Sequence, residues 1–97
     1  MAEIVFDAEL WEWDGEGAWF FVTVPEDDTE HVRMVAGPPR GFGSVRVEAT
    51  VGATTWRTSV FPDKRSGCFL LPVKQAVRRA EGIVAGDVVH VEVDVVG

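Results

Sequence analysis

Apolar and polar residues alternate along most of the chain, a pattern that is typical of β-strands with one face in a core. In the last alternating stretch, Val89, Val91 and Val93 share one face, and His90 lies on the opposite, solvated face. Six stretches show this alternation or a short apolar run of strand length: residues 3–11, 18–24, 44–51, 54–61, 68–73 and 88–95. The pattern therefore predicts a mainly β protein.

Turn residues separate the predicted strands. Asp14-Gly15 is a hairpin signal between the first two strands, and Pro25 ends the second strand because it cannot donate to a ladder. A two-residue turn at Gly52-Ala53 would place Glu48 opposite Arg57. That pair would be an exposed cross-strand salt bridge worth less than about 1 kcal/mol, which removes Arg57 from the candidates for an anion site.

Two segments have helical character. Residues 74–81 predict a helix of about two turns that ends at Gly82, followed by a turn at Gly86-Asp87 and the last strand. The acidic segment 26–37 predicts one or two helical turns before Gly37 and Pro38-Pro39 break them. Short strands with one apolar face must pair or close to bury it. We expect a small closed or partly open β-barrel of about six strands, with one short helix before the last strand.

Length and composition narrow the class of protein. The 97 residues predict one domain, residues 1–97, and the 46% hydrophobic content excludes a disordered chain. No apolar run reaches the roughly 20 residues that span a bilayer, and the amino-terminal segment is acidic where a secretory signal is basic. The lone Cys68 fits a reducing compartment. We expect a soluble cytoplasmic protein with no membrane association.

The net charge of −7 is unevenly distributed. Residues 1–39 hold ten acids and one base, whereas residues 40–79 hold eight bases and two acids. One interpretation is that oppositely charged strands neutralise each other, within a chain or across a homodimer. The other is a basic face that binds an anion. The bases of the middle segment are Arg40, Arg46, Arg57, Lys64, Arg65, Lys74, Arg78 and Arg79.

The aromatic residues supply a second set of candidates. We expect Trp19, Phe20 and Phe21 to fill the barrel and Trp56 to pack against the second helix. Tryptophans on the outer face of the first strand would instead form an exposed patch, and an indole flanked by arginines would suit an anionic aromatic molecule. The candidate ligand-binding residues are Arg46, Arg65, Lys74, Arg78, Arg79, Trp11, Trp13 and Trp56.

Catalysis has little support in the sequence. His31 lies in the acidic segment, His90 lies on a polar strand face, and Cys68 is in a position typical of a small buried residue. The acids around His31 are consecutive, so they lack the spacing that brings several ligands to one metal ion. We expect no enzyme, no metal site and no cofactor.

The order of the motifs points to a known family. The segments "FDAELWEWDGEGAWFFVTVP", "GSVRVEATVGATTWRTSVFP" and "GCFLLPVKQAVRRAEGIVAGDVVHVEVDV" resemble the small prokaryotic family called "domain of unknown function 1905". The resemblance covers about residues 4–95 and implies a β-barrel. Some members carry a YdeI/OmpD-associated domain after the barrel, which these 97 residues do not include. The family has no assigned activity, so the resemblance implies no catalytic residues.

The closing segment also resembles, more distantly, swapped-hairpin antitoxins and transition regulators, in which two chains interlock and a basic face contacts DNA. The net charge of −7 makes nucleic acid an unfavourable partner, because binding needs several phosphate contacts. Our main hypothesis is a non-catalytic binding module for a small anionic ligand or a protein partner, with self-association as a homodimer open. The alternative is a nucleic-acid-associated regulator of the antitoxin type.

Overall fold

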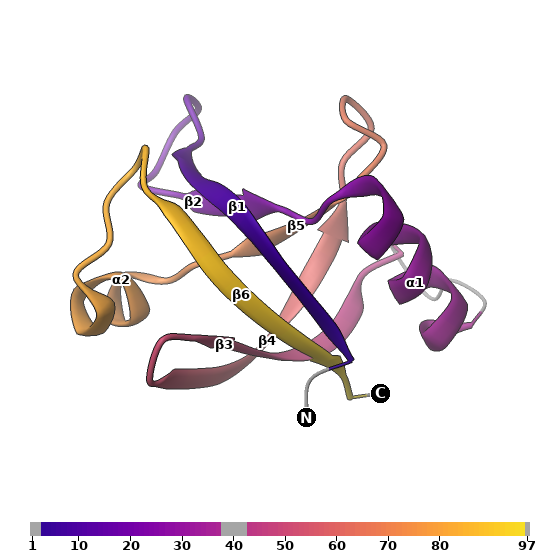
Figure 1. Ribbon diagram of the computed structural model, residues 1–97. Helices are drawn as coiled ribbons and strands as arrows, with labels where there is room; N and C mark the ends of the chain where they lie inside the picture. Colours follow the sequence, from indigo (N-terminus) through magenta and orange to yellow (C-terminus); the bar gives the residue numbers. More distant parts are fainter. Residues whose placement is uncertain (1–2, 38–42, 97) are drawn as a thin grey trace.

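The computed structural model describes residues 3–37 and 43–96, which form six strands and two helices (Figure 1). Arg40 and the expected break at Pro38-Pro39 lie outside the described residues. The elements are β1 (Ile4–Glu12), β2 (Phe20–Thr23), α1 (Glu26–Ala36), β3 (Val45–Val51), β4 (Thr54–Pro62), β5 (Phe69–Pro72), α2 (Gln75–Glu81) and β6 (Val88–Val95). No helix in this part of the chain is long and apolar enough to cross a membrane.

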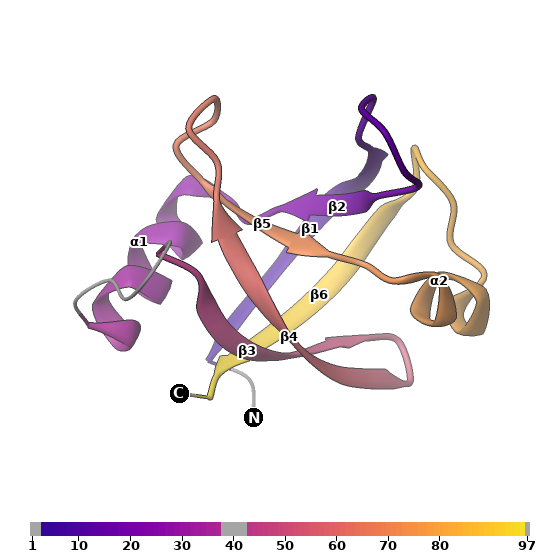
Figure 2. The ribbon, with the colours of Figure 1, turned by 180° about the vertical axis from the view of Figure 1, so that it is seen from behind.

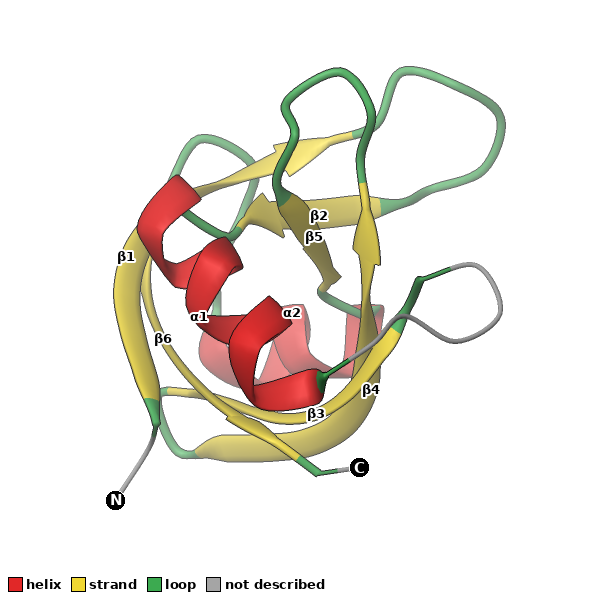
Figure 3. Cartoon of the chain, turned by 90° about the vertical axis from the view of Figure 1, so that its right-hand side faces the viewer, coloured by secondary structure: helices red, strands yellow, loops and turns green. Residues whose placement is uncertain are grey.

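The strands form a closed barrel in the order β1-β2-β5-β4-β3-β6, with every neighbouring pair antiparallel (Figure 3). The last strand closes the ring because β6 pairs with β1 on one edge and with β3 on the other. The turn before it is tied to β1: Gly86 N–H donates to Leu10 O, and Leu10 N–H donates to Asp87 O, both at 2.8 Å. The predicted mainly β barrel of six strands, with a short helix before its last strand, is confirmed, and of the two predicted forms, closed or partly open, the structure has the closed one.

Alternation along the strands fills the barrel with apolar side chains from every strand. In β6, Val89, Val91 and Val93 are buried, as predicted. The two helices cover the opposite ends of the barrel (Figures 1 and 3). Each helix contributes a buried valine to the same core, Val32 from α1 and Val77 from α2. The interior is therefore a packed core, and any site has to lie on the outside.

Three expectations about local structure can be compared with the structure. The Gly52-Ala53 turn is confirmed: Val51 pairs with Thr54, and Glu48 lies opposite Arg57. The hairpin signal at Asp14-Gly15 is confirmed, because β1 and β2 pair as antiparallel neighbours, although their loop spans residues 13–19. The estimate of one or two turns for the acidic segment is too short, because α1 has 11 residues.

Burial explains the length of α1, which begins after Pro25 without a side-chain cap. Thr29 is 1% exposed and links the helix to two strand ends. Its hydroxyl donates to Val24 O and accepts from Phe69 N–H, each at 3.1 Å. Since helical stability in proteins comes mostly from packing, these contacts and the buried Val32 allow an acidic segment to stay helical over 11 residues.

Replacing Thr29 by Val should destabilise the protein by about 1–3 kcal/mol, because the Phe69 N–H would lose its acceptor inside the core. The measurement is the free energy of unfolding in urea. Thr29→Ser is the matched control: it keeps the hydroxyl and loses one methyl group, so its cost should be about 1 kcal/mol. A valine variant as stable as the parent would show that the hydroxyl does not hold the Phe69 amide.

The C-terminal end of α2 is fastened to the turn between β3 and β4. Glu81 accepts from the Thr54 hydroxyl at 2.6 Å and from Ala53 N–H at 3.4 Å. Gly52 has a φ of +59° and lies against the Glu81 carboxylate, because a Cβ at this position would come within 1.8 Å of Glu81 Oε1. Both the left-handed backbone and the closeness of Glu81 therefore call for glycine at this position.

Gly52→Ala should cost about 2 kcal/mol of stability, since it adds the left-handed backbone penalty to the loss of the Glu81 hydrogen bonds. Gly82→Ala is the control: its φ is +63°, but nothing lies within 4 Å of the added Cβ, so only the backbone penalty applies. The difference between the two variants, measured by thermal unfolding, should shrink in a Glu81→Ala background. Equal costs in the parent would contradict the fastening role of Glu81.

Candidate functional site

Aromatic side chains gather on one half of the outer surface of the barrel. On β2, Val22 is buried, so its neighbour Phe21 points outward. Phe21 lies opposite Trp11 of β1 in the antiparallel register, and the two rings are 5.2 Å apart. Loops 13–19 and 63–67 project from the barrel on either side of β2 and β5 (Figure 2). This half of the outer surface is therefore aromatic and bounded by two loops.

One groove lies between the two loops and has a volume of about 580 Å³. We call it the aromatic groove. It is lined by Trp11, Glu12, Trp13, Asp14, Trp19, Phe21, Phe61, Asp63, Arg65 and Leu70. Three of its aromatic side chains are widely exposed: Trp13 by 41%, Trp19 by 54% and Phe61 by 46%. The volume is within the range of small-molecule sites.

Short-range contacts hold the tryptophans of this groove in place. Trp11 Nε1–H donates to the Thr23 hydroxyl at 3.0 Å. Trp13 N–H donates to Trp19 O at 2.9 Å and closes loop 13–19. The Trp13 ring lies so close to Gly15 that a Cβ there would come within 2.1 Å of it. The glycine is therefore needed for the position of the indole.

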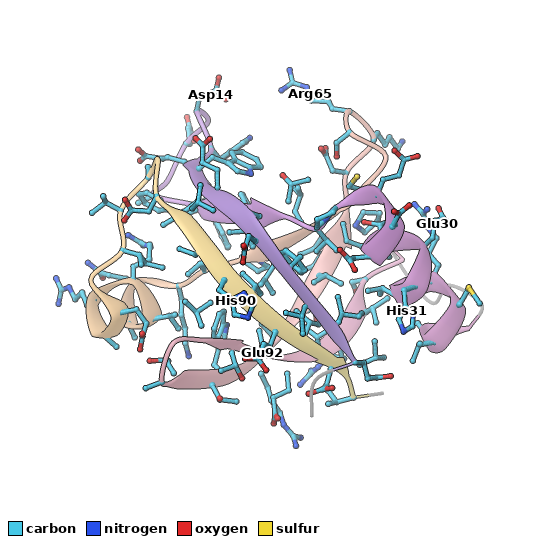
Figure 4. All side chains as sticks on the ribbon, viewed as in Figure 1. Asp14, Glu30, His31, Arg65, His90 and Glu92 are labelled. Carbon is cyan, nitrogen blue, oxygen red and sulfur yellow. The ribbon has the colours of Figure 1, made fainter. Side chains whose placement is uncertain are left out.

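Loop 63–67 is an ordered turn organised by the Asp63 carboxylate. That carboxylate accepts from the Ser66 hydroxyl at 2.8 Å and from the backbone N–H groups of Ser66 and Arg65 at 3.3 and 3.4 Å. The hydrogen bond from the Ser66 hydroxyl, with those from the backbone, lowers the pKa of Asp63 below its usual value. Asp14 and Arg65 lie at the tips of the two loops (Figure 4).

A second groove of about 590 Å³ lies between β4, α2 and the start of β2. We call it the basic groove. It is lined by Ala18, Trp19, Phe20, Trp56, Arg57, Thr58, Phe61, Pro72, Val73, Lys74, Gln75 and Arg78. Trp19 and Phe61 belong to both grooves and form the ridge between them. Among the described residues, none of those that line the basic groove is a carboxylate.

The bases of this groove are held in different ways. The Arg78 guanidinium lies 3.8 Å from the centre of the Phe20 ring, and Arg78 Nε–H donates to Val73 O at 3.1 Å. Arg57 pairs with Glu48 at 3.4 Å, as predicted from the register. Within residues 3–37 and 43–96, neither Lys74 nor Arg78 has a carboxylate partner. Two positive charges of this groove are therefore not neutralised by acids of the described residues.

The eight candidate residues divide between the grooves. Trp11, Trp13 and Arg65 line the aromatic groove. Trp56, Lys74 and Arg78 line the basic groove. Arg46 on β3 and Arg79 on α2 are exposed and line neither. The five candidate bases thus do not converge on one cavity.

The expectation that Trp19, Phe20 and Phe21 all fill the barrel is wrong for two of them. Only Phe20 packs against the core, whereas Trp19 is exposed and Phe21 lies on the outer face. Trp56 is buried, and it lines the basic groove together with Arg78 of α2. Sequence reasoning missed Trp19 and Phe61 as groove residues. For Phe21, the alternation of β2 was an available signal: with Val22 facing the core, its neighbour Phe21 must face outward.

The groups considered for catalysis lie outside both grooves. His90 is exposed, as expected, and its Nδ1 lies 2.7 Å from an oxygen of Asp7, its cross-strand neighbour on β1 (Figure 4). Cys68 is half-buried between loop 63–67 and the start of β5. In the part of the chain that the structure describes, no group of three or more His, Cys, Asp or Glu side chains is arranged to hold a metal ion.

Comparison with known families assigns the chain. The family model described as "Domain of unknown function (DUF1905)" matches residues 6–93. The chain belongs to this family. The match runs from β1 into β6, so the DUF1905 region contains all of the barrel except the first two residues of β1 and the last two of β6, and it contains every described residue that lines the two grooves. A search of the curated proteins finds no match.

The lowered pKa of Asp63 predicts that the stability of this DUF1905 barrel depends on pH. A carboxyl whose folded pKa is depressed adds stability above its unfolded pKa, and this stability is lost as the pH falls through the folded pKa. Ser66→Ala removes the largest cause, so the pKa of Asp63 should rise toward its ordinary value. NMR titration of the Asp63 carboxyl carbon measures the pKa directly. An unchanged titration in the alanine variant would contradict the role of the Ser66 hydroxyl.

Proposed function

We propose that this barrel is a non-catalytic binding module that holds a small, flat anionic molecule in the basic groove. The observation that carries the proposal is the composition of that groove. Aromatic side chains line it together with Arg57, Lys74 and Arg78, and its lining residues include no carboxylate. Ligand sites typically combine apolar walls with a few placed charges.

The charges of the groove favour an anion because two of them are available. Lys74 is exposed at the start of α2 and has no carboxylate partner among the described residues. Arg78 is fixed over Phe20 by stacking and by its bond to Val73 O, so its orientation requires little further ordering on binding. An aromatic acid would place its ring on Trp19 or Phe61 and its carboxylate near these bases.

Two other candidates from the sequence receive less support. A nucleic-acid-associated regulator needs many phosphate contacts along one surface, yet the bases Arg46, Arg65 and Arg79 lie away from the basic groove. A protein partner would use the same exposed aromatic surface but would not require the unpaired Lys74. We therefore propose the small anionic ligand.

The test uses 2-naphthoate and its neutral analogue 2-naphthamide as probes, followed by chemical-shift changes in NMR spectra of the labelled protein. Naphthoate should shift resonances of the basic groove and bind more tightly than naphthamide. Lys74→Gln should weaken naphthoate binding roughly two- to fivefold, the range of a partly exposed ion pair, and leave naphthamide unchanged.

Arg79→Gln is the matched control, because it removes one positive charge from the same helix at a residue outside the groove. It should leave naphthoate binding close to that of the parent. Equal losses in the Lys74 and Arg79 variants would show a general charge effect and overturn the proposal. Naphthoate and naphthamide binding with equal affinity would overturn it as well.

A further inference from the structure

We propose that the aromatic groove is a second, separate site, which takes the alkylated ammonium group of a small organic cation. The two sites share Trp19 and Phe61, but this inference does not rest on the ligand proposed for the basic groove. It rests on two features of the aromatic groove: the exposed aromatic rings, and an excess of negative charge beside them.

The rings of Trp11, Phe21 and Trp19 lie beside one another and form an aromatic surface along the groove. Trp11 and Phe21 are tilted by 39° to each other at 5.2 Å, and Trp19 lies nearly parallel to Phe21 at 6.2 Å. Trp13, from loop 13–19, contributes a further ring, which packs against Gly15. The face of an aromatic ring attracts a cation, most strongly for tryptophan. An alkylated ammonium group also carries apolar methyl groups, which would cover indoles that are otherwise exposed to water.

The charge of the groove selects the sign of the ligand. Glu12 and Asp14 come from the end of β1 and loop 13–19, and Asp63 comes from the facing loop. Arg65 is the one base among the described lining residues, so the lining holds three carboxylates and one guanidinium. The basic groove on the other side of the Trp19–Phe61 ridge has bases and no carboxylate among its lining residues. The two grooves therefore favour ligands of opposite charge.

The dimensions of the groove favour a small molecule over a polypeptide segment. The volume is about 580 Å³, and the loops at residues 13–19 and 63–67 stand on either side of it (Figure 2). This volume suits a compact ligand. Each loop is closed by backbone hydrogen bonds, Trp13 N–H to Trp19 O and Asp63 N–H to Cys68 O, both 2.9 Å.

The test compares choline with 3,3-dimethylbutan-1-ol, a neutral molecule of nearly the same shape. The readout is the set of indole N–H shifts of Trp11, Trp13 and Trp19 during an NMR titration. Choline should bind at least about threefold more tightly than the neutral alcohol, because only choline gains the cation–π and carboxylate attraction. Trp13→Ala, which changes only this groove, should weaken choline binding and leave naphthoate binding at the basic groove unchanged.

Charge variants give effects of opposite sign. Glu12→Gln with Asp14→Asn should weaken choline binding about two- to fivefold, whereas Arg65→Gln should strengthen it by a similar factor. Glu92→Gln is the control for net charge, because Glu92 lies on β6 and lines neither groove (Figure 4). Weaker choline binding in Arg65→Gln would overturn the proposal.

Two further outcomes would overturn it: equal affinity for choline and the neutral alcohol, or no saturable shift with choline. The basic-groove proposal fails on other measurements. Lys74→Gln should leave choline binding unchanged, so a loss of naphthoate binding with intact choline binding would separate the two sites.

Discussion

Closure of the barrel by β6 is the constraint on which the rest of the structure depends. This strand completes two ladders at once, with β1 and with β3, and its alternate valines fill the interior. The turn at Gly86-Asp87 holds β6 in register through two backbone hydrogen bonds to Leu10. A closed sheet has no edges left to pair, so inward and outward faces are defined for every strand of the ring.

A filled interior moves the candidate sites to the outside. The helices cover both ends of the barrel and add Val32 and Val77 to the core. The surface of β1, β6 and β3 carries polar pairs such as Asp7 with His90. On the other half of the ring, Phe21 and Phe61 lie on the outer face, the two loops border the aromatic groove, and α2 borders the basic groove. Binding residues of this barrel therefore occupy outward strand positions and loops.

The uneven charge of the sequence leads neither to complete neutralisation between strands nor to a single basic face. Local neutralisation occurs between Glu48 and Arg57, as expected from the turn. The remaining bases do not gather on one face: Lys74 and Arg78 lie in one groove, and Arg65 lies among carboxylates in the other. Trp19 and Phe61 separate two grooves of opposite charge, which makes two ligands of opposite sign a consistent picture of the surface.

The sequence by itself determined the strands, the turn at Gly52-Ala53 and the helix before β6, because alternation and turn residues act over a few positions. It predicted a barrel, and the pairing of β6 with both β1 and β3 decided that the barrel is closed. Family membership followed from the same order of motifs. Tertiary structure decided the length of α1, which depends on the burial of Thr29, and the placement of Trp19 outside the barrel. It also decided which bases share a groove. Lys74 and Trp56 line the same groove only because α2 packs beside β4, and no pattern along the chain encodes the distance between elements that are remote in sequence.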